Sequence, residues 1–268
     1  MSEKNPPCQM EAASDNGRRS FLKHFLLALA ALFVPKFVFG NEKRQEVRDW
    51  VMAGGYNPYK HRYGMAIDIS KCIGCGQCVE ACKSENNVPR EPFFFRTWVE
   101  RYRVLDNGET IVDSPNGAMN SFNYEPREEE IVRGFFVPKL CNHCDNPPCV
   151  QVCPVGATFK SPDGVVLVDS DYCVGCRYCI QACPYGARFL HPVTKTAEKC
   201  TFCYHRIVKG QQPACVEACP TQARVFGELD TKASPLARFM RMNKIAVLKP
   251  SHNTEPKVYY ADMDMEVN

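Results

Sequence analysis

Apolar residues along this chain occur in short stretches that alternate with polar positions. Alternation at residues 63–69, 96–105 and 109–112 predicts three short strands. Asp106-Asn107-Gly108 separates the last two strands and has the residue types of a tight turn, so we expect a β-hairpin there. Twenty prolines and sixteen glycines are spread along the chain, which also favours many short elements joined by turns.

A second hairpin is expected where residues 156–160 and 165–169 flank the turn Ser161-Pro162-Asp163-Gly164. Further short strands are expected at residues 187–190, 245–248 and 258–260. Ser234 followed by Pro235 is typical of an N-cap and first helical position, which predicts a helix to about residue 242. Residues 79–82 are expected to form one helical turn, and residues 116–130 and 204–212 to form loops.

The longest apolar run covers residues 25–34 and follows the basic segment Arg18-Arg19-Ser20-Phe21-Leu22-Lys23. This combination is typical of a signal peptide, whereas a helix that spans a bilayer needs about 20 apolar residues. Val38 and Gly40 suit the −3 and −1 positions, so we expect cleavage after Gly40. The paired arginines resemble a twin-arginine export signal, with Gly17 where Ser or Thr is usual. We therefore expect export to the periplasm by the twin-arginine machinery; an uncleaved amphipathic helix or anchor is the alternative.

Cysteine is the residue type that most changes this picture, because the chain has 17 of them. Sixteen form four quartets, and only Cys8 stands apart. The quartets are Cys72, Cys75, Cys78, Cys82; Cys141, Cys144, Cys149, Cys153; Cys173, Cys176, Cys179, Cys183; and Cys200, Cys203, Cys215, Cys219. The third has the spacing C-x2-C-x2-C-x3-C-P that is typical of 4Fe-4S ligation. Pro follows the closing cysteine of three quartets, whereas Lys83 follows Cys82.

Zinc and disulfides are the two alternative uses of these cysteines. Zinc sites usually consist of separated C-x2-C pairs, and a tight C-x2-C-x2-C triplet does not easily present four thiolates to one zinc ion. Disulfides are disfavoured by the tight spacing and by a signal for export in the folded state. His143 lies inside the second quartet, but the four cysteines suffice as ligands without it. The spacing therefore predicts four 4Fe-4S clusters.

The quartets also suggest an internal repeat, because two precede the hairpin at 157–169 and two follow it. The predicted fold is α+β, a duplicated bacterial-ferredoxin-like fold with four cluster-binding loops, short hairpins and short helices. The expected domains are a signal peptide (1–40), an N-terminal arm (41–62), a double ferredoxin-like four-cluster domain (63–227) with an insertion at 84–139, and a C-terminal wrap (228–268).

Charge and motifs limit the function classes. A net charge of +3 does not support nucleic-acid binding, and no phosphate-binding loop, dinucleotide fingerprint or nucleophile triad is present. With all sixteen thiolates committed to clusters, no iron has an open position for a substrate. The sequence therefore favours an electron-transfer protein without a catalytic site of its own.

Two groups of residues have alternative interpretations. Basic residues near the fourth quartet could tune reduction potentials or steer a partner, but a solvated basic face explains most of them better: Lys195, Lys199, His205, Arg206 and Lys209. Aromatic residues of the insertion could form a docking surface, but packing against the core is the favoured interpretation: Phe93, Phe94, Phe95 and Trp98.

Several long motifs resemble one protein family. CNHCDNPPCVQVCP, CVGCRYCIQACPYGARF, HPVTKTAEKCTFC and PACVEACP are similar to motifs of the iron–sulfur electron-transfer subunits of the dimethyl-sulfoxide-reductase superfamily. RYGMAIDISKCIGCGQC and IAVLKPSHNTEPKVYY resemble the exported tetrathionate reductase type, and HPVTKTAEKC resembles the nitrite-reductase-associated type. The resemblance covers roughly residues 60–260.

The resemblance implies that the quartets are paired crosswise. The implied ligand sets are Cys72, Cys75, Cys78 with Cys219; Cys200, Cys203, Cys215 with Cys82; Cys141, Cys144, Cys149 with Cys183; and Cys173, Cys176, Cys179 with Cys153. It also implies that the Cys72 cluster faces a molybdopterin catalytic subunit and the Cys173 cluster faces a quinol-oxidising membrane subunit.

The expected function is electron transfer from that membrane subunit to a periplasmic reductase of tetrathionate or another sulfur oxyanion. A multihaem cytochrome of nitrite or sulfite respiration is the alternative acceptor. A free-standing polyferredoxin and a zinc-stapled assembly protein are alternatives of other classes; the insertion and the long tail argue against the first.

Overall fold

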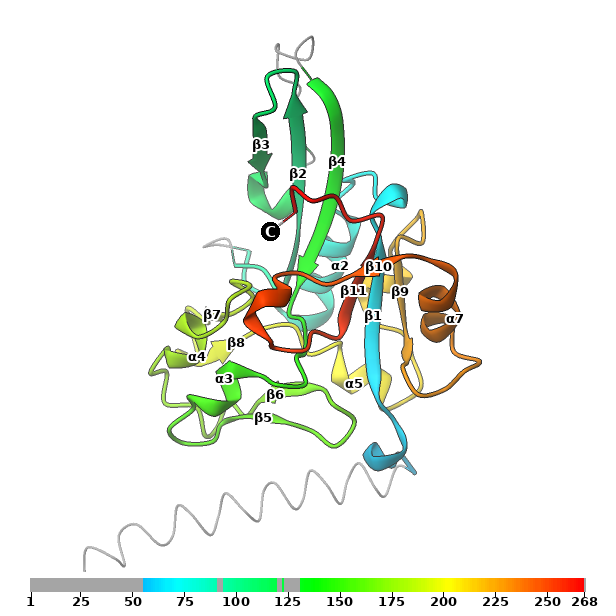
Figure 1. Ribbon diagram of the computed structural model, residues 1–268. Coiled ribbons are helices and arrows are strands. Elements are labelled where there is room, and N and C mark those ends of the chain that lie inside the picture. Colours follow the sequence, from blue (N-terminus) through cyan, green and yellow to red (C-terminus); the bar gives the residue numbers. More distant parts are fainter. Residues whose placement is uncertain (1–54, 91–93, 120–121, 123–130, 268) are drawn as a thin grey trace, which may run out of the picture. The chain divides into compact units, whose positions relative to one another are not determined.

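The computed structural model describes residues 55–90, 94–119, 122 and 131–267 (Figure 1). The expected signal peptide, its cleavage site, Cys8 and most of the expected arm lie outside these residues. Within the described part of the arm, Tyr56 is buried and its hydroxyl donates to Asp163 (2.6 Å), so this end of the arm packs against the body. In the described part of the chain, no helix combines the length and apolar character needed to cross a membrane.

A four-stranded sheet with the order β10-β11-β1-β9 joins the two ends of the described chain. Strand β1 (Tyr63–Asp68) pairs in parallel with β11 (Val258–Ala261) and antiparallel with β9 (Arg224–Glu228). Strand β10 (Ile245–Ala246) adds to the outer side of β11. All six residues of β1 are buried, because the strand has a neighbour on each side and side chains packed over it.

Helix α7 (Pro235–Met242) packs on this sheet beside β9 and β1 (Figure 1). The predicted start is confirmed, since the Ser234 hydroxyl accepts a hydrogen bond from the Ala237 amide (3.0 Å) and Pro235 occupies the first turn. Leu236 is fully buried over Gly64 and Gly227, which are cross-strand partners. A Cβ atom at either glycine would lie 3.1–3.2 Å from Leu236, so the absence of a side chain there lets the helix approach the sheet.

A second sheet, with the order β3-β2-β4, is built from the insertion (Figure 1). The predicted hairpin is confirmed as β2 (Thr97–Leu105) and β3 (Thr110–Asp113). Strand β4 (Ile131–Leu140) pairs with the other edge of β2 and leads directly into Cys141. Tyr102 stacks on Phe135, with ring centroids 5.1 Å apart, and thereby ties β2 to β4.

Two further hairpins are very short. Strands β5 (Thr158–Lys160) and β6 (Val166–Val168) form the hairpin expected at 156–169. Strand β7 (Phe189–Leu190) confirms the strand predicted at 187–190, and it pairs with β8 (Ala197–Glu198), which the sequence pattern did not predict.

Helix length depends on the residue that follows each closing cysteine. Helices α3 (Pro148–Gln151), α4 (Tyr178–Gln181) and α6 (Ala214–Glu217) are four residues long, and each is followed two residues later by a Cys-Pro pair. Proline disfavours helical geometry in the residue before it, so these helices stop early. Helix α2 (Gln77–Asn86) has Lys83 at the corresponding position and runs for ten residues. The prediction of one helical turn at 79–82 was therefore too short.

The remaining elements are single turns. Helix α5 (Tyr204–Ile207) lies in the stretch 204–212 that was expected to be a loop, so that prediction was wrong for its first half. Short 3-10 turns are η1 (Pro58–Lys60), η2 (Ile69–Lys71), η3 (Pro115–Ala118) and η5 (Pro250–His252).

Candidate functional site

The first candidate site is a hollow lined by four cysteines from opposite ends of the described chain. Cys72 and Cys75 come from the loop between η2 and α2, Cys78 lies in the first turn of α2, and Cys219 follows α6. Gly76 at the start of α2 has φ +71°, and a Cβ there would lie 1.9 Å from the Ala118 carbonyl oxygen. The loop can therefore take this path only with glycine at position 76.

A second hollow is lined by Cys141, Cys144, Cys149 and Cys183. Cys141 and Cys144 lie between the end of β4 and helix α3, Cys149 lies in α3, and Cys183 follows α4. Asn142 also lines this hollow and is almost fully buried. Its amide nitrogen and oxygen find no hydrogen-bond partner among the residues that the structure describes. A buried polar group of this kind indicates a missing partner inside the hollow.

A third group brings Cys82 to the fourth quartet. Burial raises the pKa of Cys82 well above its ordinary value, and the nearby thiolates of Cys200, Cys215 and Cys203 raise it further. The Asn86 amide lies 3.7 Å from the Cys82 sulfur and 3.5 Å from the Cys203 sulfur. The structure thus places Cys82 beside the sulfurs of quartet four, as it places Cys219 beside those of quartet one.

The last group contains Cys173, Cys176 and Cys179. Cys179 is buried in an apolar cluster with Cys149, and Cys173 packs against that cluster. The Cys173 sulfur accepts a hydrogen bond from the Ala197 amide (3.3 Å). Cys176 is exposed. The addition of Cys153 to this triplet stays a prediction.

Backbone amides point at the closing cysteines that precede proline. The Cys153 sulfur accepts from the Thr158 amide (3.5 Å) and the Cys219 sulfur from the Ala223 amide (3.3 Å). Burial raises the pKa of Cys153, but hydrogen bonds from the Thr158 amide and from the backbone amides just before it lower the pKa more. The pKa of Cys153 therefore lies below its ordinary value. The shared pattern is C-P-x-x-A at 153–157, 183–187 and 219–223, a signal in the sequence that cysteine spacing alone does not include.

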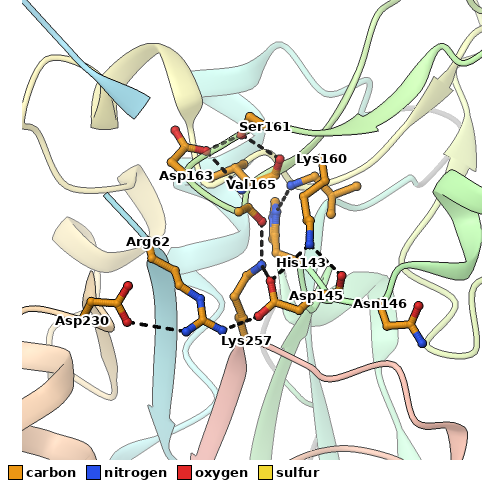
Figure 2. A network of polar contacts seen from close by, with 12 residues as sticks. Arg62, His143, Asp145, Asn146, Lys160, Ser161, Asp163, Val165, Asp230 and Lys257 are labelled. Atoms are coloured by element: carbon orange, nitrogen blue, oxygen red, sulfur yellow. Dashed lines mark hydrogen bonds and ion pairs between the residues drawn. The ribbon is translucent and has the colours of Figure 1, made fainter. Parts of the chain in front are cut away.

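The C-terminal segment fixes the loop of the second quartet (Figure 2). The Lys257 amide donates to the Asn142 carbonyl (2.9 Å), and the Asp145 amide donates to the Glu255 carbonyl (2.9 Å). The buried Lys257 ammonium donates to Asp145 and to the Gly164 carbonyl, each at 2.7 Å. Arg62 reaches Asp145 from the other side at 2.6 Å. Burial raises the pKa of Asp145, but Lys257 and Arg62 lower it below its ordinary value, so the carboxylate is charged at neutral pH.

His143 is packed within the protein interior. Its Nδ1 accepts from the Val166 amide (3.1 Å), and its ring stacks on Phe202 with centroids 3.7 Å apart. These contacts account for the ring face and for Nδ1, whereas the buried Nε2 finds no hydrogen-bond partner among the described residues. The preference for the four cysteines over His143 stays a prediction.

Most of the basic residues near the fourth quartet are solvated, as expected: Lys195, His205 and Lys209 are exposed. Lys199 is almost fully buried and donates to the Val166 and Cys200 carbonyls, so the solvated interpretation was wrong for this residue. Arg206 is ion-paired with Glu85 (2.8 Å) and with Glu217 (2.5 Å).

The described aromatic residues of the insertion pack internally. Phe94 stacks on Phe189 with centroids 5.1 Å apart, and the Lys83 ammonium lies 4.4 Å from the centroid of Phe95. The Trp98 indole donates to Glu100 (2.8 Å). The packing interpretation is therefore supported for Phe94 and Phe95, while Phe93 lies outside the described residues.

The donor geometry fits iron–sulfur clusters better than single metal ions. Across the ranges that the structure describes, no group of three or more His, Cys, Asp or Glu side chains is arranged to hold one metal ion. Four thiols spread around a hollow suit a cube in which each thiolate binds a different iron. The inorganic sulfides of such a cube would also accept hydrogen bonds from the Asn142 amide.

Comparisons with known proteins agree with this chemistry. Residues 71–157 and residues 132–229 each match a family model described as a 4Fe-4S dicluster domain. Together the two ranges contain all sixteen quartet cysteines. The chain therefore contains ferredoxin-like dicluster domains.

Similar proteins extend the match over most of the chain. The B subunit of tetrathionate reductase from Salmonella typhimurium is 41% identical over 257 residues, which cover 93% of this chain and 90% of the relative. The corresponding protein of Archaeoglobus fulgidus is 44% identical over 238 residues, 89% of this chain and 98% of the relative. Protein NrfC of Escherichia coli (strain K12) is 43% identical over 200 residues, 74% of this chain and 79% of the relative. The chain belongs to the family of 4Fe-4S electron-transfer subunits that includes the B subunit of tetrathionate reductase.

Proposed function

We propose that this chain holds four 4Fe-4S clusters and relays electrons through them between two partner proteins. The proposed ligand sets are Cys72, Cys75, Cys78, Cys219; Cys82, Cys200, Cys203, Cys215; Cys141, Cys144, Cys149, Cys183; and Cys153, Cys173, Cys176, Cys179. A bound 4Fe-4S cluster supplies one-electron transfer. The chain itself supplies thiolates, backbone amides aimed at sulfur, and a dry interior.

The observation that carries the proposal is the order in which the cysteine groups neighbour one another. The Arg224 guanidinium donates to the Cys78 sulfur (3.3 Å) and lies 3.7 Å from the Cys215 sulfur, so the first and third groups described above are neighbours. Burial raises the pKa of Cys200, and the thiolates of Cys215 and Cys141 raise it further, so Cys141 lies near this group. Cys149 packs with Cys179 in one apolar cluster. This order of neighbours supports one path from the Cys72 group through the Cys200 and Cys141 groups to the Cys173 group.

The two ends of this path support contacts with different partners. At the Cys173 end, Cys176 is exposed, and so are the apolar side chains of Val174 and Tyr178 on either side of it in the sequence. At the other end, Ile73 is exposed between Cys72 and Cys75. Exposed apolar side chains beside a redox centre suit docking, because they exclude water from the path of the electron.

We assign the Cys173 end to a quinol-oxidising integral membrane subunit and the Cys72 end to a molybdopterin catalytic subunit. The similarity to the tetrathionate reductase relatives supports a reductase of tetrathionate or another sulfur oxyanion as the complex. The proposed location is the periplasm, after twin-arginine export, with attachment to the membrane through the partner. A multihaem cytochrome acceptor is the alternative, in line with the resemblance to the nitrite-associated type.

The testing experiment is an affinity capture of this protein from detergent-solubilised membranes of its host. The captured complex would be analysed by mass spectrometry and for molybdenum, iron and acid-labile sulfide. A large molybdenum-bearing partner and a quinol-binding membrane protein support the proposal. A multihaem cytochrome without molybdenum would favour the alternative acceptor. Zinc without acid-labile sulfide would refute the cluster proposal altogether.

A further inference from the structure

Two arginines occupy equivalent places in the internal repeat. Arg188 and Arg224 each follow a closing cysteine by five residues, within the pattern C-P-x-x-A-R at 183–188 and 219–224. Their relative exposures are only 5% and 2%. Arginine is rarely buried to this degree without an anionic neighbour, because removing its charge from water is unfavourable.

Arg224 spans two of the proposed ligand sets. One guanidinium nitrogen donates to the Cys78 sulfur (3.3 Å), and the other lies 3.7 Å from the Cys215 sulfur. The first nitrogen also donates to the Thr97 hydroxyl (2.8 Å), which holds the planar group in place. Cys78 belongs to the Cys72 set and Cys215 to the Cys200 set, so a single side chain touches both.

Arg188 holds the corresponding place in the other half of the chain. It donates to the Cys149 sulfur (3.1 Å) and to the Thr158 hydroxyl (3.3 Å). Burial lowers the pKa of Arg188, but the thiolates of Cys149, Cys141 and Cys179 raise it more, so it lies above the ordinary value. Since Cys179 belongs to the Cys173 set, this arginine also acts on two neighbouring sets.

The anionic neighbours of both guanidinium groups are sulfurs. Their described hydrogen bonds go to cysteine sulfurs and threonine hydroxyls, and none of the ion pairs found in the described part of the chain joins either of them to a carboxylate. In the described part of the chain no carboxylate therefore offsets these positive charges, and the low dielectric constant of the interior strengthens their effect on the neighbouring anionic sulfurs.

We propose that Arg224 and Arg188 each place a permanent positive charge between two neighbouring clusters and raise the reduction potentials of both. Adding an electron makes a cluster more negative, so a fixed cation nearby stabilises the reduced form. The same cation weakens the repulsion between electrons on adjacent clusters. The inference rests on the proposed function, because it requires clusters in all four sites.

The test is a potentiometric titration, monitored by EPR, of the full cluster-loaded chain that carries Arg224→Gln or Arg188→Gln. We expect Arg224→Gln to lower two of the four potentials and Arg188→Gln to lower the other two. A tenfold or larger fall in each reduction equilibrium is expected, which corresponds to about 59 mV for one electron. Arg224→Lys and Arg188→Lys keep the charge and should restore most of each shift, which a purely structural role would not do.

Arg238→Gln is the matched control, because it removes one positive charge from α7, outside every ligand set. Equal shifts in this control, or four unchanged potentials in fully loaded Gln variants, would overturn the inference. If a Gln variant does not load its clusters, Arg→Met at the same position is titrated instead, since it is uncharged and of similar length. Iron and sulfide analysis of the wild-type protein tests the proposed function separately. Zinc in the wild-type protein, or fewer than four clusters, would contradict the proposed function itself.

Discussion

Single residues decide how the chain continues after the closing cysteine of each quartet. Pro154, Pro184 and Pro220 each follow a four-residue helix and its closing cysteine, and backbone amides face the sulfurs of Cys153 and Cys219. Lys83 replaces this proline in the first quartet, and its buried ammonium donates to the Pro89 (2.8 Å) and Phe94 (2.7 Å) carbonyls. Lys83, at the position where the other quartets have proline, thus anchors the chain just before strand β2.

The closing cysteine Cys183 provides a test of the crosswise ligand sets. Cys183→Ser should damage the cluster held by Cys141, Cys144 and Cys149, because Cys183 lines their hollow. The EPR signal that is lost should match the signal lost in Cys144→Ser and differ from the one lost in Cys176→Ser. Loss of the Cys176 signal in Cys183→Ser would contradict the crosswise sets.

Lys257 provides a test of the polar network in Figure 2. Lys257→Met removes a buried partner of Asp145 and leaves the Gly164 carbonyl without its donor. We expect a loss of stability of about 3 kcal/mol, the lower end for a broken buried pair, since Arg62 still contacts Asp145. The measurement is the thermal unfolding of the cluster-loaded protein.

Lys160→Met is the matched control for this measurement. The Lys160 ammonium donates to the Asp145 carbonyl (2.8 Å) and lies 3.7 Å from the Asp145 carboxylate, but its side chain is partly exposed, so a loss of about 0–1 kcal/mol is expected. Equal losses of stability in Lys257→Met and Lys160→Met would show that the buried Lys257–Asp145 pair contributes no more than the exposed Lys160–Asp145 pair.

At the scale of elements, α7 packs on the four-stranded sheet, which we call the central sheet. Leu236→Ala removes a fully buried side chain over Gly64 and Gly227 and should destabilise the protein by about 2–5 kcal/mol. Met242→Ala, at an exposed position on the same helix, should change stability little. Thermal unfolding of both variants checks this expectation, and similar midpoints would show that α7 contributes little to the sheet.

Local signals predicted the elements well where they were strong. The Ser234-Pro235 helix start and the turns at 106–108 and 161–164 were all placed correctly, because capping and turn residues act within a few positions. The parallel pairing of β1 with β11 has no local signal, since its residues lie at opposite ends of the described chain. Neither does the pairing of β4 with the outer edge of β2.

The candidate site was predictable in part for the same reason. Cysteine spacing indicated the cofactor, but the buried arginines at Arg188 and Arg224 carry no periodic signal that separates them from surface residues. Lys199 was assigned to solvent because a basic residue in a polar stretch usually lies there. Its burial depends on contacts with residues distant in the sequence, such as the Val166 carbonyl.

For the whole molecule, three buried cations of the described part lie near the candidate cluster ligands and in no ion pair found there. Arg188 and Arg224 contact cysteine sulfurs, and Lys199 donates to two backbone carbonyls. Other buried cations have acidic partners, as Lys257 has in Asp145 and Lys139 in Glu100. Each 4Fe-4S cluster with its thiolates carries a net negative charge, so the proposed clusters would offset these three charges. They would therefore stabilise the interior electrostatically as well as through their bonds.

Removal of the clusters should accordingly destabilise the fold more than any single substitution above. Treatment of the anaerobic holoprotein with an iron chelator should lower the midpoint of thermal unfolding by more than Leu236→Ala does. Circular dichroism checks this, with the untreated holoprotein in the same buffer as the control. An apoprotein as stable as the holoprotein would contradict the electrostatic argument.

The place of β11 in the central sheet has a consequence for biosynthesis. Strand β1 leaves the ribosome early, but its parallel partner at Val258–Ala261 and the segment that pairs with the Cys144 loop are translated much later. A nascent chain that stops before residue 253 already contains all sixteen quartet cysteines, yet it has neither partner. The chain is thus synthesised with all sixteen quartet cysteines before the strand that completes its sheet. A chain that lacks only β11 keeps these cysteines but loses a central strand of the four-stranded sheet.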